Sequence, residues 1–264
     1  RKFGSKTPGH PEYKKTKFVE VSTGPLGQGV ANAVGMAIGQ SMVGARFNAQ
    51  KANIIDNYTY CYCGDGCLEE GVAQEACSLA GALKLKKLIL LYDSNNITID
   101  GKVSLANTED VSKKFKSMNW NVIKVKNGNS YFWCSRAIAK AKRSSKPTII
   151  IFNTTIGYGT SYAGTEKIHG IPLSDKELIE YKNDLLMPNF TKFSQDVKDY
   201  CFRSIRYNKI LLEKWKRMYC LYEQTHPELC RQFESFIGEK ETDVLKLLKP
   251  DVLQEEMSGR EAKQ

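Results

Sequence analysis

The chain contains the run Tyr60-Cys61-Tyr62-Cys63-Gly64-Asp65-Gly66, in which an apolar segment ends in a tight Gly-Asp-Gly turn. A second apolar segment, residues 87–92, leads into Asp93-Ser94-Asn95-Asn96, so that Asn95 follows Asp65 by thirty positions. With a helix between them, the two segments predict parallel strands that end at the same edge of a sheet. Carboxylate and amide oxygens at that edge suit a hard divalent cation that bridges a diphosphate. The triplet alone would also fit an ordinary strand-to-helix turn, with glycines at positive φ and an aspartate cap.

Strand and helix patterns alternate on both sides of this motif and predict an α/β fold. The alternation implies right-handed crossovers and a parallel sheet with helices on both faces. Small residues within positions 27–47 (Gly35, Ala37, Gly39) are typical of a helix that packs closely. A loop at 157–172 is long enough to indicate a functional role. Strands are expected at residues 58–63, 87–92, 121–125 and 148–154, and helices at 69–84, 111–118 and 131–143.

After Leu173 the pattern becomes helical. Ser174 and Glu177 form a capping-box signature at a helix start. Met187-Pro188-Asn189 interrupts the pattern, and a long amphipathic helix is expected at residues 194–224. His226-Pro227-Glu228 opens another helix that runs to about Phe236, and the remaining residues, 238–264, are polar and poorly periodic.

Composition limits the classes of partner. The 264 residues are 41% hydrophobic, enough for a core in one or two domains, and no run of eighteen apolar residues predicts a membrane span. The net charge of +10 resides in short lysine and arginine clusters at the ends or on the polar sides of expected helices. Aromatic residues do not interleave with these clusters, so we expect no nucleic-acid partner, and a basic nucleic-acid module is only a weak alternative. The lack of an apolar run likewise predicts no membrane partner.

The eight cysteines lack paired zinc-type spacing and are interpreted as free thiols of a reducing compartment. Cys61 and Cys63 alternate within a strand and Cys67 lies beyond the turn. Buried thiols are therefore a better interpretation than a metal cluster.

Several motifs together resemble the transketolase family. The resemblance runs almost without gaps from Arg1 to about Leu173 and more loosely to about Phe233. It is carried by Thr7-Pro8-Gly9-His10-Pro11-Glu12, Ser22-Thr23-Gly24-Pro25-Leu26-Gly27-Gln28-Gly29, Gly64-Asp65-Gly66-Cys67-Leu68-Glu69-Glu70-Gly71, Tyr92-Asp93-Ser94-Asn95-Asn96-Ile97-Thr98-Ile99-Asp100-Gly101, Thr155-Ile156-Gly157-Tyr158-Gly159 and Ile168-His169-Gly170.

The resemblance implies thiamine diphosphate as cofactor, with Mg²⁺ or Ca²⁺. Asp65, Asn95 and the main-chain carbonyl of Ile97 are the implied metal ligands, although Ile97 would otherwise read as an ordinary turn or strand residue. Gly66 has no side chain, so its N–H can approach a phosphate oxygen. Glu70 would join a carboxylate network across a dimer interface, or would simply favour a helix start.

Two further implied sites lie in loops. Gly24-Pro25-Leu26 would border the cofactor rings, with the Gly24 carbonyl accepting from the exocyclic amine and Leu26 in apolar contact. A proline-fixed turn ahead of a helix explains the same residues. His10 and His169 would act on the reactive carbon of the cofactor and on the first oxygens of the sugar, since imidazole moves protons near neutral pH. His226 matches no motif and is interpreted as structural.

The implied activity is transfer of a two-carbon ketol unit from a ketose phosphate to an aldose phosphate in the pentose phosphate pathway. Implied partners are xylulose 5-phosphate, ribose 5-phosphate, erythrose 4-phosphate and a second copy of the chain, in the cytoplasm. Residues 1–190 would form a diphosphate-binding domain that lacks its N-terminal part. Residues 191–264 would form a helical extension toward a pyrimidine-binding domain.

Family members carry further sequence on both sides, including a glutamate of the next domain that contacts the aminopyrimidine ring. We therefore expect the chain to be a fragment that is inactive alone. Two features depart from the family: Tyr162 stands where many members have histidine or lysine, and one residue is inserted between His10 and Gly24. Dihydroxyacetone synthase and a non-catalytic remnant of the fold remain alternatives. Deoxyxylulose-phosphate synthase should lack the first two motifs.

Overall fold

The computed structural model describes residues 10–238 except residues 11, 18 and 188–191. The predicted polar tail beyond residue 238 and the break at Pro188-Asn189 lie outside the described residues. By internal contacts, the chain divides into two compact units. One comprises residues 1–43 and 56–202, and the other comprises residues 44–55 and 203–264.

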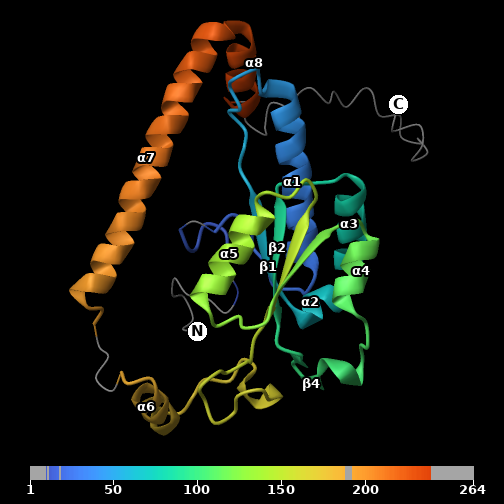
Figure 1. The fold of residues 1–264 in the computed structure, drawn as a ribbon, viewed down its shortest axis with the longest axis vertical. Helices are drawn as coiled ribbons and strands as arrows, with labels where there is room; N and C mark the ends of the chain where they lie inside the picture. The colour runs from blue at the N-terminus through green and yellow to red at the C-terminus, as the bar shows by residue number, and fades with distance from the viewer. Residues whose placement is uncertain (1–9, 11, 18, 188–191, 239–264) are drawn as a thin grey trace, which may run out of the picture. The chain divides into compact units, whose positions relative to one another are not determined.

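The first unit is built on a four-stranded parallel sheet in the order β1-β2-β6-β5. The predicted α/β fold with a parallel sheet is therefore confirmed, and every predicted strand is present within two residues of its expected ends (Figure 1). The register pairs Gly64 with Asp93, which brings the Gly-Asp-Gly turn beside the end of the next strand. The strands are β1 Thr59–Gly64, β2 Leu88–Ser94, β5 Asn121–Val125 and β6 Thr148–Asn153.

Helices cover the sheet because its central strands are apolar on both faces. In β2, Leu88 and Leu90 pack into one core cluster while Ile89 packs into the other. The first cluster includes residues of α1 (Gln28–Phe47), α3 (Gly71–Ala82) and α4 (Val111–Ser117), and the second includes residues of α5 (Tyr131–Ala141). Figure 1 shows α5 on the opposite face from α3 and α4. This arrangement exposes the carboxyl ends of the strands at one edge.

The small residues of α1 pack unequally within this unit. Ala37 is buried, but a Cβ added to Gly35 or Gly39 would meet no atom within 4 Å in the described part of the chain. Only one side of α1 is therefore covered within this unit, because the apolar positions of a helix lie on a single stripe.

Two local elements differ from the sequence prediction. The helix expected over residues 69–84 is divided into α2 (Asp65–Glu69) and α3, and Glu70 between them is extended (φ −74°, ψ 133°). Glu70 thus precedes α3 and does not lie in its first turn. An unpredicted antiparallel hairpin, β3 (Ile97–Thr98) with β4 (Gly101–Lys102), follows β2. Strands of two residues carry too short a pattern to be recognised.

The loop at residues 157–172 is confirmed, apart from a short 3-10 helix at Glu166–Ile168. It leads to α6 (Asp175–Asp184), where Ser174 and Glu177 form the predicted capping box. The predicted long helix is α7 (Gln195–Thr225), followed by α8 (Pro227–Gly238). No helix in the described residues has the length and apolarity needed to cross a bilayer.

Residues 44–55 are held within the second unit by the helices far along the chain. The buried Tyr222 hydroxyl donates to the Phe47 carbonyl over 2.8 Å, and the Trp215 indole N–H donates to the Ile54 carbonyl over 3.0 Å. The Phe47 ring also meets Phe233, with ring centroids 5.3 Å apart. Buried hydrogen bonds and aromatic contacts therefore fix this segment.

Gly81→Ala should destabilise the first unit by about 3 kcal/mol or more. Gly81 is buried at the end of α3, and a Cβ there would lie 1.8 Å from the Met118 carbonyl oxygen. The Met118 carbonyl oxygen belongs to the backbone and cannot rotate out of the way of this Cβ, so α3 and the end of α4 must separate. Urea unfolding of the 264-residue chain, followed by circular dichroism, measures the loss. Gly35→Ala makes the same substitution in open helix surface and should stabilise by about 0.5–1 kcal/mol. Equal midpoints for both variants would contradict the packing of Gly81.

All eight cysteines are free thiols, and they differ in accessibility. Burial raises the pKa of Cys61 to about 11 and of Cys77 to about 12, so both are protonated in the folded protein near pH 8. A thiol reagent at about pH 8 should label the exposed Cys201 and Cys220 first and the two buried thiols only on unfolding, when their pKa falls to its usual value. Mass-spectrometric mapping checks the order. Cys61 labelled as fast as Cys201 would contradict it.

Candidate functional site

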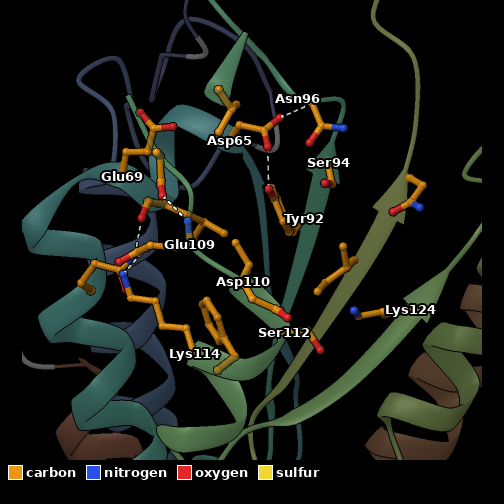
Figure 2. A pocket seen from close by; sticks show the side chains of 18 residues that line it. Asp65, Glu69, Tyr92, Ser94, Asn96, Glu109, Asp110, Ser112, Lys114 and Lys124 are labelled. Carbon is orange, nitrogen blue, oxygen red and sulfur yellow. Dashed lines mark hydrogen bonds and ion pairs between the residues drawn. The ribbon is translucent and has the colours of Figure 1, made fainter. Parts of the chain in front are cut away.

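Asp65 is the buried carboxylate of the predicted site. Its side chain, 6% exposed, begins α2 at the carboxyl end of β1. The Tyr92 hydroxyl donates to one carboxylate oxygen over 2.5 Å. The backbone N–H groups of Asn95 and Asn96 donate to the other over 3.1 and 3.0 Å. Figure 2 shows the bonds of Tyr92 and Asn96 to this carboxylate. The ends of β1 and β2 are thus joined through one carboxylate, as the spacing of Asp65 and Asn95 predicts.

Asn95 and Ile97 continue from this carboxylate. The Asn95 side-chain oxygen accepts the backbone N–H of Ile97 over 2.9 Å, which orients the amide at the start of β3. Ile97 is itself buried. The three predicted metal ligands therefore lie in one hydrogen-bonded group.

The electrostatics of Asp65 fit a cation. Burial raises the pKa of its carboxyl, and the three hydrogen bonds offset this rise only in part. A bound cation would supply the missing compensation for the buried charge. In the described part of the chain, no three His, Cys, Asp or Glu side chains gather as a metal site. A cation here would take one carboxylate, neutral oxygens of the chain and oxygens of its ligand, which is the preference of Mg²⁺ or Ca²⁺.

The Gly24-Pro25-Leu26 loop lies directly on the Gly-Asp-Gly turn. A Cβ added to Gly66 would lie 3.0 Å from the Leu26 side chain. At Gly27, where φ is +79°, a Cβ would lie 2.6 Å from the Glu70 Cβ. Glycine is needed at position 27 for both its φ and this approach. The loop and the turn together form a cradle that a larger residue would fill.

His10 lies over the same loop. A Cβ added to Gly24 would lie 3.5 Å from Nδ1 of His10, whose ring is otherwise exposed. The structure therefore brings His10 and Gly24 together and, through Leu26, connects them to Gly66.

His169 is placed apart from this group. It caps the 3-10 helix in the 157–172 loop, is exposed, and donates its backbone N–H to the Glu166 carbonyl over 2.9 Å. The loop begins at the edge that holds Asn95, because the Thr154 N–H donates to the Ser94 carbonyl over 3.2 Å and the Thr154 hydroxyl to Asp93. Among the described residues, no hydrogen bond joins the His169 side chain to His10 or Asp65. The loop thus starts at this edge, whereas no described contact brings His169 itself to the Asp65 group.

Behind Asp65 lies a cavity of about 270 Å³, into which Figure 2 looks. Tyr92, Glu69, Glu109 and Lys114 are on its wall, and Lys114 pairs with Glu109 over 2.5 Å. With four acidic and two basic lining residues, this cavity disfavours an anion. A diphosphate would therefore be held on the side of Gly66 and the Gly24-Pro25-Leu26 loop.

Tyr92 is a site residue that the sequence does not reveal. It is 4% exposed and lies in the apolar run of β2, where an aromatic residue reads as ordinary core. Its hydroxyl orients the Asp65 carboxylate, and only the register of Cys63 with Tyr92 in the sheet discloses this role.

Tyr92→Phe should weaken metal-supported binding of thiamine diphosphate about tenfold or more, because a hydrogen bond to a charged group contributes about 1.5–3 kcal/mol. Calorimetric titration of the full-length protein measures the change. Tyr62→Phe is the matched control: it removes an exposed hydroxyl that donates to Asp93 over 3.3 Å at the same edge. The affinity of this control for thiamine diphosphate should stay within twofold of wild type. Similar losses of affinity in both variants would contradict a special role for Tyr92.

Comparisons with known proteins identify the family. The family described as "Transketolase, thiamine diphosphate binding domain" matches residues 1–241. Transketolase-1 of Arabidopsis thaliana chloroplasts is 45% identical over 242 residues, which cover 90% of this chain and 32% of that protein. Transketolase 1 of Saccharomyces cerevisiae is 44% identical over 240 residues, 87% of this chain and 34% of that one.

Solved structures show the same likeness. Transketolase from Leishmania mexicana superposes with a TM-score of 0.86 at 46% identity, over 89% of this chain and 36% of that chain. The transketolase of Campylobacter jejuni gives a TM-score of 0.77 at 38% identity, over 95% of this chain and 37% of that chain. The chain thus spans about a third of the length of these relatives. With a family match over most of its length and a buried Asp65 at the edge where the family motif expects it, the chain belongs to the transketolase family as a thiamine diphosphate binding domain.

Proposed function

We propose that this chain provides the diphosphate-binding half of a transketolase active site, which transfers a two-carbon ketol unit from a ketose phosphate to an aldose phosphate. The observation that carries the proposal is Asp65, a buried carboxylate that is hydrogen-bonded to the turn containing Asn95 and directly precedes Gly66, on which the Leu26 side chain lies. Transketolase structures from Pichia stipitis are described as complexes with xylulose 5-phosphate, fructose 6-phosphate and sedoheptulose 7-phosphate. Sugar phosphates are accordingly the proposed substrates, with xylulose 5-phosphate as donor and ribose 5-phosphate or erythrose 4-phosphate as acceptor.

The chain's own residues would bind and orient the cofactor. Asp65, the Asn95 amide oxygen and the Ile97 carbonyl would hold Mg²⁺ or Ca²⁺, and the Gly66 N–H would meet a phosphate oxygen. The Gly24-Pro25-Leu26 loop would contact the rings. Thiamine diphosphate would supply the electron-accepting centre that carbon–carbon bond cleavage requires.

Proton handling would fall to two histidines. His10 is held over the ring-binding loop, and His169 lies in a loop that starts beside β2. Each imidazole can donate to or accept from a sugar oxygen near neutral pH.

Assembly completes the proposal. Residues 1–190 would act as the diphosphate-binding domain and residues 191–264 as a helical extension. The rings of the cofactor would then meet a pyrimidine-binding domain of a second subunit in a homodimer. Glu70, exposed at the break between α2 and α3, would contribute to a carboxylate network at that interface. The corresponding cellular role is that of a cytoplasmic enzyme in the pentose phosphate pathway.

A ketol-transfer assay on the full-length protein tests this function. Xylulose 5-phosphate and ribose 5-phosphate should be converted to sedoheptulose 7-phosphate and glyceraldehyde 3-phosphate only when thiamine diphosphate and a divalent metal are present. No transfer under saturating cofactor would favour a non-catalytic member of the fold.

A further inference from the structure

A continuous part of the chain concentrates the positive charge. Residues 111–165 contain ten Lys or Arg residues and no Asp or Glu, and the whole chain carries a net charge of +10. This part includes β5, α5 and β6. Lys113 and Lys114 pair with Asp110 and Glu109, and the remaining cations give this part of the chain an excess of positive charge.

A groove of about 700 Å³ lies where β5 meets α5. In the described part of the chain β5 pairs with β6 alone, so its other edge is open and presents unpaired backbone groups. The volume falls within the range of small-molecule sites, about 300–1,000 Å³. The buried floor comprises Ile123, Val125 and Ala137, which pack α5 onto the sheet.

The helix lines this groove with a stripe of one aromatic and three cationic residues. Trp133, Arg136, Lys140 and Arg143 follow each other at intervals of three, four and three, which places them along one side of α5 and its C-terminal turn. Lys126, directly after β5, adds to the charged lining, and Lys124 borders both this groove and the cavity behind Asp65. Of these five cations, none forms an ion pair with a described residue.

Exposed aromatic rings stand at one end of the stripe. Tyr131, Phe132 and Trp133 are consecutive at the start of α5 and are 78%, 58% and 55% exposed. The rings of Phe132 and Trp133 meet edge to face at 5.1 Å, which supports the indole at the groove. Large exposed aromatic residues beside a groove mark a binding surface. In sequence the basic clusters have no interleaved aromatics, but the fold places Trp133 and Lys126 on the lining of one groove.

We propose that this groove binds a phosphate-rich small molecule with a planar ring, the chemistry of a nucleoside polyphosphate. Arg136, Lys140 and Arg143 would pair with phosphate oxygens, for which guanidinium groups offer paired donors. Trp133 would stack on the ring. The site is separate from the proposed cofactor site: Asp65, Asn95 and Gly66 do not line the groove. It does not depend on the proposed transketolase activity.

Calorimetric titration of the 264-residue chain with adenosine triphosphate and with inorganic tripolyphosphate tests the proposal. A chelator is present throughout, so that the Asp65 site cannot hold a metal-bound diphosphate. The double variant Arg136→Glu/Lys140→Glu should raise the Kd for both ligands at least tenfold. Trp133→Ala should weaken only adenosine triphosphate, about fivefold to tenfold, because tripolyphosphate has no ring to stack.

The matched control is Lys84→Glu/Lys86→Glu, which makes the same charge change at two exposed lysines between α3 and β2, outside the groove lining. Its Kd values should stay within twofold. Circular dichroism verifies that each variant folds. If the double variant does not fold, Arg143→Glu repeats the test at a residue beyond the end of α5.

Three results would overturn the proposal. Equal losses in the groove and control variants would mean a diffuse response to net charge. If Trp133→Ala weakened the binding of both ligands equally, or of neither ligand, Trp133 would not stack on a ring of the ligand. A single-stranded oligonucleotide of 20 nucleotides that binds more than tenfold tighter than adenosine triphosphate, per phosphate, would make the groove part of a nucleic-acid surface instead.

Discussion

Asp65→Ala should abolish metal-supported binding of thiamine diphosphate to the full-length protein, with a loss of about 100-fold or more in affinity. Asp65 is the one carboxylate in the predicted ligand group, and Asn95 and Ile97 offer only neutral oxygens. Without its charge, neither the cation nor the diphosphate is neutralised, and about 3 kcal/mol or more of binding free energy is lost. Calorimetry with magnesium and with a chelator measures the difference between the two conditions.

Two further variants make this result interpretable. Asp65→Asn keeps the shape and should lose nearly as much affinity, because charge is the missing property. Asp100→Ala removes an exposed carboxylate of the neighbouring β3–β4 turn and should bind normally. An unchanged affinity in Asp65→Ala would remove the site assignment.

His10→Ala and His169→Ala should each lower kcat by about 10²–10⁴-fold, the usual contribution of a positioned acid or base. Cofactor affinity should change far less, because neither imidazole belongs to the group of oxygens around Asp65. Steady-state ketol transfer, together with calorimetry, separates the two quantities.

His226→Ala is the control for this pair. His226 lies between α7 and α8 in the second unit, where its ring meets Tyr222 at 5.8 Å and its N–H donates to the Tyr222 carbonyl. The turnover of the His226→Ala variant should stay close to that of the wild type. If all three variants lost turnover in parallel with helical circular dichroism, the first two histidines would be structural.

Much of the fold could be predicted from the sequence because its signals are local. The β-branched residues of β6 and the apolar run of β2 predict buried strands. Their parallel direction follows from the helices that connect the strands. The capping box at Ser174 is similarly local, since its two partners are three residues apart. The pairing of Asp65 with Asn95 follows from the same rule, because parallel strands end at a shared edge.

Contacts between distant residues account for what the sequence could not reveal. The break at Glu70 coincides with its contact with Gly27, and the role of Tyr92 depends on the register of β1 and β2. His10 is brought to Gly24 while His169 stays apart, although the two histidines carry equally clear motifs.

The sequence by itself therefore determined the α/β class and the sheet edge at which Asp65 and Asn95 meet, because alternation and helical periodicity act over a few residues. The tertiary structure decided which side chains meet. It joined residues 44–55 to the helical unit through a Tyr222–Phe47 hydrogen bond that spans 175 positions, and it placed Trp133 of α5 and Lys126, directly after β5, on the lining of one groove. Such contacts depend on how whole elements pack, and packing is a property of surfaces assembled from distant parts of the chain.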